Sequence, residues 1–354
     1  MRIFDRYLAR SFLRGWLGVN LVFAGLFSFL ELAKQLDDVG EGAYRMADAL
    51  LYVLLTLPGR ILDLAPPSAL LGGIIGLGLL AKHFELLALQ TFGISIQRIG
   101  WTVVRPAVLA LLALLLGAQF LIPRLEHTAW IRRETALSDS GKILPRGGFW
   151  TRDGKRFINL RTARSDGSQT VDIYSFDVRD RLTGYTHARE ADIGEGGSWI
   201  LRDVQTKEIS EKGSLTRKMP RLVVPDLLSR EQAEVLALPP QALSFSDLFG
   251  FIAALEERGQ NADRYRLTLW QKLSLPVMTA AMIMLSLPFV FGPARSASLG
   301  WRIMLGAIIG VTVFFLGQVL GYTGLILQIP PVWTTLVPAL IVLACGIFMA
   351  RRIV

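Results

Sequence analysis

The chain has 354 residues, of which 52% are hydrophobic and 19% are Asp, Glu, Lys or Arg. This balance argues against a soluble globular protein and indicates an integral membrane protein, because charge is depleted from most of the sequence. The net charge of +9 does not indicate a nucleic-acid partner, since the basic residues flank apolar segments or scatter through a polar block without forming a dense run.

Six long apolar stretches lie three and three around one polar block. A membrane-spanning helix needs about 20 consecutive apolar residues. The clearest stretch has no charged residue between Ile303 and Ala350, and Pro330 with Pro331 divides it into two helices. The four earlier predicted spans are Gly15 to Leu30, Leu64 to Ala81, Trp101 to Ile122 and Leu273 to Pro293.

The polar block is typical of short antiparallel strands separated by turns. Asp153-Gly154 between short apolar segments predicts a hairpin. We expect one buried and one solvated sheet face. The predicted strands are Phe149 to Thr151, Arg156 to Leu160, Val171 to Val178, Tyr185 to Asp192 and Trp199 to Ile209.

Helical connectors are expected on both sides of the strands, over residues 124–136 and 246–258. Ser244 or Ser246 is suited to cap the second connector, and Gly259 to end it. The predicted domains are therefore residues 1–123 with spans one to three, 124–265 with the β domain, and 266–354 with spans four to six.

Basic residues gather on one side of the predicted spans. The short connections on the other side, residues 37–47 and 328–331, contain only Arg45 as a basic residue. By the positive-inside rule we expect both termini in the cytoplasm and the β domain across the membrane. The basic set is Arg2, Arg6, Arg10, Arg14, Lys82, Arg98, Arg295, Arg302, Arg351 and Arg352.

No motif for catalysis, metal binding or nucleotide binding occurs in the sequence. There is one cysteine, and the three histidines are dispersed, so we expect no disulfide, metal or other cofactor. Gly141-Lys142 lacks the other residues of a Walker A loop, so ATP-driven work requires a separate subunit. The carboxylates and His187 of the polar block fit a solvated surface better than an active site.

Residues 82–93, between spans two and three, predict a short helix on the cytoplasmic side. Phe84, Leu87 and Ala88 form an apolar stripe, and Glu85 points elsewhere. Two hypotheses follow. The segment is either an interfacial helix lying on lipid, or a coupling helix seated in a groove of a cytoplasmic ATPase, where Glu85 meets a basic residue.

Several charged residues lie near the opposite ends of the spans. Lys34 sits among acidic residues at the end of span one, where snorkelling is one explanation. Arg60 is three residues from Asp63, a possible partner. Arg132 and Arg133 either face an anionic amphiphile or are solvated. The glycines from Gly72 to Gly78 permit close helix packing.

The chain resembles the LptF/LptG family of lipopolysaccharide export permeases over nearly its full length. The matching stretches occur in order and at matching spacing. They are Phe4-Asp5-Arg6-Tyr7, Ala69 to Gly72 through Gly76-Leu77-Gly78, Glu85-Leu86 with Gln90 and Gly93, Gly148-Phe149-Trp150 with Asp153-Gly154, Arg264-Tyr265 through Trp270-Gln271-Lys272, Phe291-Gly292-Pro293 with Arg295-Ser296, and Ile329-Pro330-Pro331.

The resemblance implies a permease with six transmembrane helices in the inner membrane and a periplasmic antiparallel β-jellyroll between helices three and four. It also implies an LptF-like permease, an LptB-like ATPase dimer and an LptC-like membrane-anchored jellyroll protein as partners. Such a permease extracts lipopolysaccharide and passes it to a periplasmic bridge towards the outer membrane.

The resemblance assigns roles to two sets of residues. Glu85 with Phe84, Leu86 and Leu89 matches the ATPase-coupling segment, and Arg133 matches a basic position at the cavity mouth. Family members often carry lysines at the end of span one, whereas this chain has Glu31, Asp37 and Asp38 there. The expected lipid-binding residues are therefore Lys34, Arg60, Arg132 and Arg133.

Two other classes of function compete with a non-enzymatic transport subunit. One is a membrane-anchored envelope enzyme acting on glycolipid, which the lack of a catalytic constellation disfavours. The other is a scaffold whose β domain only recruits partners, which leaves the membrane helices without a role.

Overall fold

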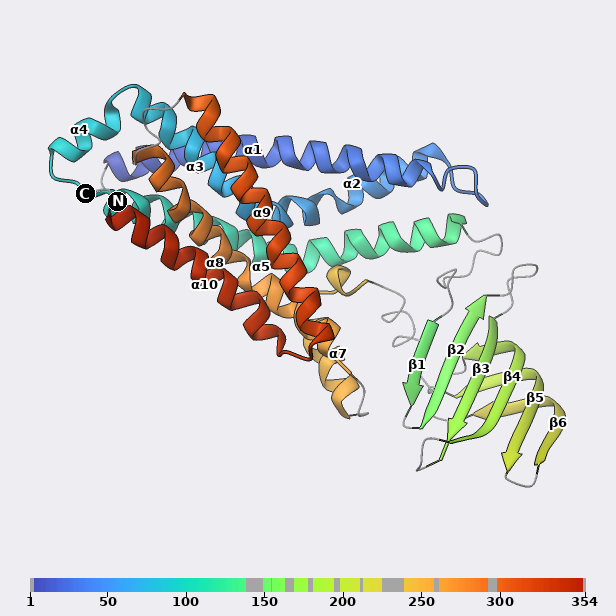
Figure 1. Cartoon of the computed structure of the whole chain (residues 1–354). Helices are drawn as coiled ribbons and strands as arrows, with labels where there is room; N and C mark the ends of the chain where they lie inside the picture. The colour runs from blue at the N-terminus through green and yellow to red at the C-terminus, as the bar shows by residue number, and fades with distance from the viewer. Residues whose placement is uncertain are drawn as a thin grey trace. The chain divides into compact units, whose positions relative to one another are not determined.

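The computed structural model describes residues 3–137, 149–153, 155–162, 169–177, 181–193, 198–210, 213–224, 239–257, 261–291 and 298–352. The chain forms two compact units, shown in Figure 1. The helical unit comprises Met1–Glu31, Thr56–Ile122 and Asp263–Val354, and the β-sheet unit comprises Leu32–Leu55 and Pro123–Ala262. Leu32–Leu55, which the sequence-based division grouped with the first spans, thus belongs to the β-sheet unit.

Among the described residues, six helices are long and apolar enough to cross a membrane, which confirms the predicted spans. The third of them begins at Ile96, before the predicted start at Trp101, and continues without a break through Pro123 to Leu137, so the expected connector over 124–136 is its continuation. The six are α1 (Ile3–Leu36), α3 (Ala65–Lys82), α5 (Ile96–Leu137), α8 (Asp263–Phe291), α9 (Leu299–Ile326) and α10 (Pro331–Arg351).

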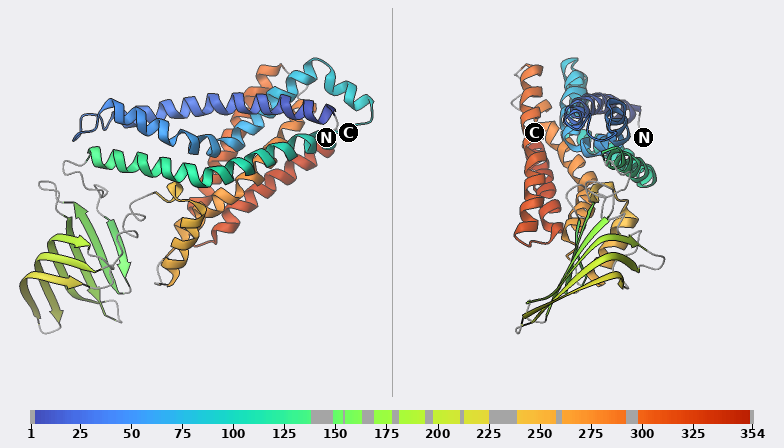
Figure 2. Two further views of the ribbon diagram at one scale, coloured as in Figure 1. Left: turned by 180° about the vertical axis from the view of Figure 1, so that it is seen from behind. Right: turned by 90° about the vertical axis from the view of Figure 1, so that its right-hand side faces the viewer.

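The helical unit is organised around α3. This helix packs against α8 and α9, and α10 packs against α8. The arrangement of these helices can be followed in the two views of Figure 2. Its core includes the fully buried side chains of Phe12, Leu70, Ile74 and Met282. By contrast, α9 and α10 expose many large apolar side chains, which is the composition expected of helices that face lipid or another membrane helix.

A helix that the sequence analysis did not predict, α2 (Met46–Asp63), precedes α3. The two are separated at Leu64, because Pro66 and Pro67 begin the new helix and have no backbone N–H to donate to the preceding turn. The hydroxyl of Ser68 donates to the carbonyl oxygens of Leu64 and Ala65 at 2.7 and 3.0 Å. The freed backbone groups are in this way partly satisfied inside the apolar unit.

Two side chains of α1 donate hydrogen bonds to the polar groups at this break between α2 and α3. The Trp16 indole N–H donates to the Ala65 carbonyl and to the Ser68 hydroxyl, both at 3.0 Å. The Asn20 amide donates to the Ile61 carbonyl at 3.1 Å and to Ser68 at 2.9 Å. Because these groups are buried, each lost bond would leave a polar atom without water, so the hydrogen bonds fix α1 against α2 and α3.

Glycines bring the backbones of α1 and α3 into direct contact. A Cβ atom at Gly72 would overlap the backbone of Trp16, one at Gly15 would lie 2.8 Å from the Gly72 carbonyl oxygen, and one at Gly76 would lie 2.9 Å from the Ser11 carbonyl oxygen. We call Gly15, Gly72 and Gly76 the glycine seam. The close packing predicted for the glycines of α3 is confirmed here.

The β-sheet unit contains one six-stranded antiparallel sheet with its described strands in chain order. The predicted hairpin is present, with Asp153 opposite Arg156, while Gly154 lies outside the described residues. The last strand was not predicted. The strands are β1 (Phe149–Asp153), β2 (Arg156–Thr162), β3 (Gln169–Phe176), β4 (Leu182–Ile193), β5 (Trp199–Ser210) and β6 (Gly213–Val224).

One face of this sheet carries an apolar core that includes Ile158, Val171, Ile173, Trp199 and Val204. Val171 and Ile173 lie on either side of Asp172, so the core face repeats every second residue, as the sequence indicated. A fold of six membrane-spanning helices with an antiparallel β region between the third and fourth is therefore confirmed.

The second predicted connector is the helix α7 (Phe245–Glu257), preceded by a 3-10 turn at Pro240–Ala242. Ser244 is its cap. The Ser244 hydroxyl accepts from the Asp247 N–H at 3.1 Å, and the Asp247 carboxylate accepts from the Ser244 N–H at 3.3 Å. This is a reciprocal capping box formed with an aspartate. The expected end at Gly259 lies outside the described residues.

The glycine seam gives a first prediction. Gly72→Ala should destabilise the protein by about 1–3 kcal/mol, because the new methyl group meets backbone atoms of α1 that cannot rotate away. Thermal unfolding in detergent measures the effect. Gly18→Ala on α1 is the matched control, since a Cβ atom there has nothing within 4 Å and should leave the unfolding temperature unchanged. Equal behaviour of the two variants would contradict the seam.

Candidate functional site

The predicted coupling segment forms the seven-residue helix α4 (Glu85–Thr91). Phe84 separates it from α3 with a left-handed backbone (φ 61°), and Gly93 follows it with φ 78°. A left-handed conformation is common for glycine and unusual for a bulky residue such as phenylalanine. A turn made by Phe84 therefore sets the direction in which α4 leaves the helical unit.

The side chains of α4 divide into an inner and an outer set. Leu86 is 1% exposed and Leu89 packs beside it on the core of the helical unit. Phe84, which is 71% exposed, Leu87 and Phe92 face outward. Of the apolar residues expected to take part in coupling, the structure thus places Phe84 on the surface and Leu86 and Leu89 inside. Phe92 is a further exposed residue that the sequence analysis did not select.

Glu85 is held by a residue from the start of α1. The Tyr7 hydroxyl donates to Glu85 Oε2 at 2.8 Å, although the two residues are 78 positions apart in the sequence. A hydrogen bond to an ionised carboxylate is stronger than one between neutral groups. The sequence analysis did not select Tyr7, because a contact between α1 and α4 leaves no signal in residue spacing.

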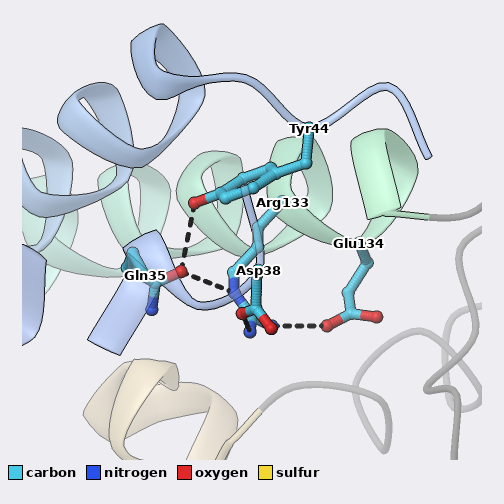
Figure 3. A network of polar contacts seen from close by, with 5 residues as sticks. All are labelled: Gln35, Asp38, Tyr44, Arg133 and Glu134. Carbon is cyan, nitrogen blue, oxygen red and sulfur yellow. Dashed lines mark hydrogen bonds and ion pairs between the residues drawn. The ribbon is translucent and has the colours of Figure 1, made fainter. Parts of the chain in front are cut away.

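The predicted basic position at Arg133 forms the centre of a polar network in the β-sheet unit, drawn in Figure 3. Arg133 donates from Nε to Gln35 Oε1 at 2.9 Å, from Nη2 to Asp38 Oδ2 at 2.6 Å, and from Nη1 to Glu134 Oε1 at 3.0 Å. Two carboxylates therefore surround one guanidinium, whose planar array of donors suits several oxygen partners at once.

Tyr44 closes the same network. Its hydroxyl donates to Gln35 Oε1 at 3.0 Å, and the residue is buried against Ala49 and Leu137. Burial raises the pKa of Tyr44 to about 12, with Arg133 acting in the opposite direction. The hydroxyl is therefore protonated at neutral pH and remains a donor. Because the Ala43 N–H also donates to the Ala136 carbonyl at 2.8 Å, the loop after α1 is attached to the end of α5.

The other predicted lipid-binding residues differ in their surroundings. Arg60 pairs with Glu31 of α1 at 3.8 Å and donates to the Ser28 hydroxyl at 3.4 Å. Lys34 and Arg132 are exposed. Two acidic residues near the end of span one thus have basic partners, since Glu31 pairs with Arg60 and Asp38 pairs with Arg133.

A second polar cluster lies in the sheet. The buried carboxylate of Asp172 on β3 accepts from the Tyr185 hydroxyl, and Nδ1 of His187 lies at the same distance of 2.7 Å. Both partners come from β4. Two hydrogen bonds satisfy the buried carboxylate, which is what a structural role requires. No group of three or more His, Cys, Asp or Glu side chains suited to a metal ion occurs among the described residues.

These features define a class, a polytopic helical membrane protein with a β domain between its third and fourth spans and a short helix between its second and third. Residues 6–352 match the lipopolysaccharide export system permease family LptF/LptG, and the chain belongs to that family. It is therefore a transport subunit and not an enzyme.

Relatives from two organisms support the assignment. The chain is 31% identical to the lipopolysaccharide export system permease protein LptG of Haemophilus influenzae over 339 residues, which cover 95% of both chains. It is 29% identical to the protein of the same name from Escherichia coli K12 over 346 residues, covering 95% of this chain and 94% of the relative.

Proposed function

We propose that this chain is the LptG-type subunit of an ABC transporter that extracts lipopolysaccharide from the inner membrane and passes it to a periplasmic bridge. Membership of the permease family over residues 6–352 carries this conclusion. Extraction needs energy, because each acyl CH₂ group contributes about 0.8 kcal/mol to membrane binding. Since the chain has no Walker A sequence, an LptB-like ATPase dimer supplies that energy. An LptF-like permease and an LptC-like jellyroll protein complete the assembly.

The outer face of α4 is the docking surface for the ATPase in this proposal. Phe84, Leu87 and Phe92 offer exposed apolar area, and Glu85 offers a negative charge beside it. A combination of apolar contacts with one charged contact suits an interface that must also fix orientation. Leu86 and Leu89 contribute by holding α4 on the helical unit.

The basic residues near the end of span one form the lipid-binding set in this proposal. The exposed Lys34 and Arg132 contact phosphate groups directly. Arg60, paired with Glu31 in the helical unit, and Arg133, shared by Asp38 and Glu134 in the β-sheet unit, belong to the set as residues that hold their surroundings in place.

The topology that we propose has both termini in the cytoplasm and the β-sheet unit in the periplasm. Basic residues at the start of α1, at the end of α3 and at the end of α10 support this orientation, because cytoplasmic ends of spans are enriched in Lys and Arg. The ATPase-binding helix α4 follows α3 directly and so lies on the cytoplasmic side.

Cysteine labelling tests this orientation. In a Cys345→Ser background, which removes the exposed native thiol, Glu208→Cys should react with a membrane-impermeant maleimide added to spheroplasts. Ser95→Cys should react only after the membrane is permeabilised. Both positions are exposed, so access to the side chain is not limiting. The reverse pattern would overturn the orientation and, with it, the direction of export.

The lipid-binding set gives another prediction. Lys34→Gln and Arg132→Gln should each reduce photocrosslinking of lipopolysaccharide in the assembled complex, with little change in the unfolding temperature. Arg133→Gln should instead lower the unfolding temperature by a few degrees, corresponding to about 1–2 kcal/mol, because it leaves two carboxylates without their shared cation. Normal crosslinking in both exposed-site variants would contradict the assignment of the direct contacts.

Charge reversal at Glu85 tests the docking surface. Glu85→Lys should leave the complex inserted and assembled, but reduce export on the order of tenfold, the effect of about 1.4 kcal/mol, because a cation would replace the anion that faces the ATPase. Export from proteoliposomes and ATP hydrolysis are measured together. Glu208→Lys, the same charge change in the β-sheet unit, is the control and should export normally. Normal export by Glu85→Lys would favour the interfacial-helix hypothesis.

A further inference from the structure

Tyr7 makes a polar contact that its position on the surface would not require. The residue is 51% exposed, so its hydroxyl has access to water. It nevertheless donates to Glu85 Oε2 at 2.8 Å. This contact joins the start of α1 to the first residue of α4, two elements that no backbone connection brings together.

The helix α4 depends on such contacts for its placement. A helix of seven residues is too short to be stable on its own, so tertiary contacts must supply its stability and direction. Leu86 and Leu89 attach one face of it to the helical unit. Those apolar contacts do not fix the Glu85 side chain, whose rotamers would otherwise be free to interconvert. The hydrogen bond from Tyr7 restricts them.

Three connections link α1, α3 and α4. The chain itself connects α3 to α4, which follows after a short turn. The glycine seam connects α3 to α1, because their backbones are in contact at Gly15, Gly72 and Gly76. The hydrogen bond from Tyr7 to Glu85 connects α1 to α4. The position of α4 is therefore connected to α1 both through α3 and through the Tyr7 hydrogen bond.

We propose that Tyr7 is a positioning residue for energy coupling, which orients the Glu85 carboxylate for its basic partner on the ATPase and ties α4 to α1. A carboxylate has about four lone-pair sites, so Glu85 accepts from Tyr7 and from a basic partner at the same time. This inference rests on the proposed docking of α4 to an ATPase. It adds that the docking contact is connected to the first membrane-spanning helix through one hydroxyl group.

The test compares Tyr7→Phe, Glu85→Ala and the double variant in the complete complex reconstituted in proteoliposomes with lipopolysaccharide. The quantity measured is lipopolysaccharide exported per ATP hydrolysed. Tyr7→Phe, which keeps the ring and removes only the donor, should lower this ratio about threefold to tenfold, the range for one hydrogen bond to a charged group that is partly exposed. The matched control is Tyr322→Phe, a tyrosine of α9 with 49% exposure, which should leave the ratio unchanged.

The double variant separates positioning from a general structural effect. Because Tyr7 acts through Glu85, adding Tyr7→Phe to Glu85→Ala should cause no further loss in the ratio, whereas independent effects would multiply. A multiplied loss overturns the inference, as does a Tyr7→Phe variant that only lowers the unfolding temperature and keeps the normal ratio. If Glu85→Ala itself keeps the normal ratio, the docking role of α4 is wrong, and that outcome is distinct from a failure of Tyr7 alone.

Discussion

The direct backbone contact between α1 and α3 is the constraint on which the helical unit depends. Only glycine at positions 15, 72 and 76 allows the two helices to approach so closely. Inside a bilayer there is little hydrophobic drive between helices, so close van der Waals packing and interhelical hydrogen bonds carry their association. The seam brings Trp16 and Asn20 within reach of the break between α2 and α3, and their hydrogen bonds then compensate for the proline residues there.

Ion pairs with other elements arrange the charge at the end of α1 and in the turn after it. The end of this helix is acidic, which seemed unfavourable for binding an anionic lipid. Glu31 of α1 faces Arg60, and Asp38, which follows α1, faces Arg133, so each of these carboxylates has an arginine partner from another element. These carboxylates therefore hold Arg60 and Arg133 in place. Lys34 and Arg132 keep their exposure and with it their capacity to meet a new anion.

Much of the architecture was predictable from the sequence because the exclusion of charge from lipid is a strong and local signal. The helix α2 was missed because Pro58, Arg60 and Asp63 interrupt its apolar pattern. The strand β6 was missed because its side chains are mostly exposed and alternate in burial only at its end. The hairpin and the helix cap were found because Asp153-Gly154 and Ser244 act through their immediate neighbours.

The candidate site was less predictable, since its geometry depends on contacts between distant segments. Glu85 stood out as a charge on an apolar helix, but neither the inward direction of Leu86 nor the bond from Tyr7 can be read from spacing. Both occur next to a left-handed turn at Phe84, a conformation that sequence rules assign to glycine or asparagine. An unusual backbone conformation is tolerated where the surrounding packing determines it. The burial of Leu86 therefore stabilises the left-handed conformation of Phe84. That conformation sets the direction of the outer face of α4.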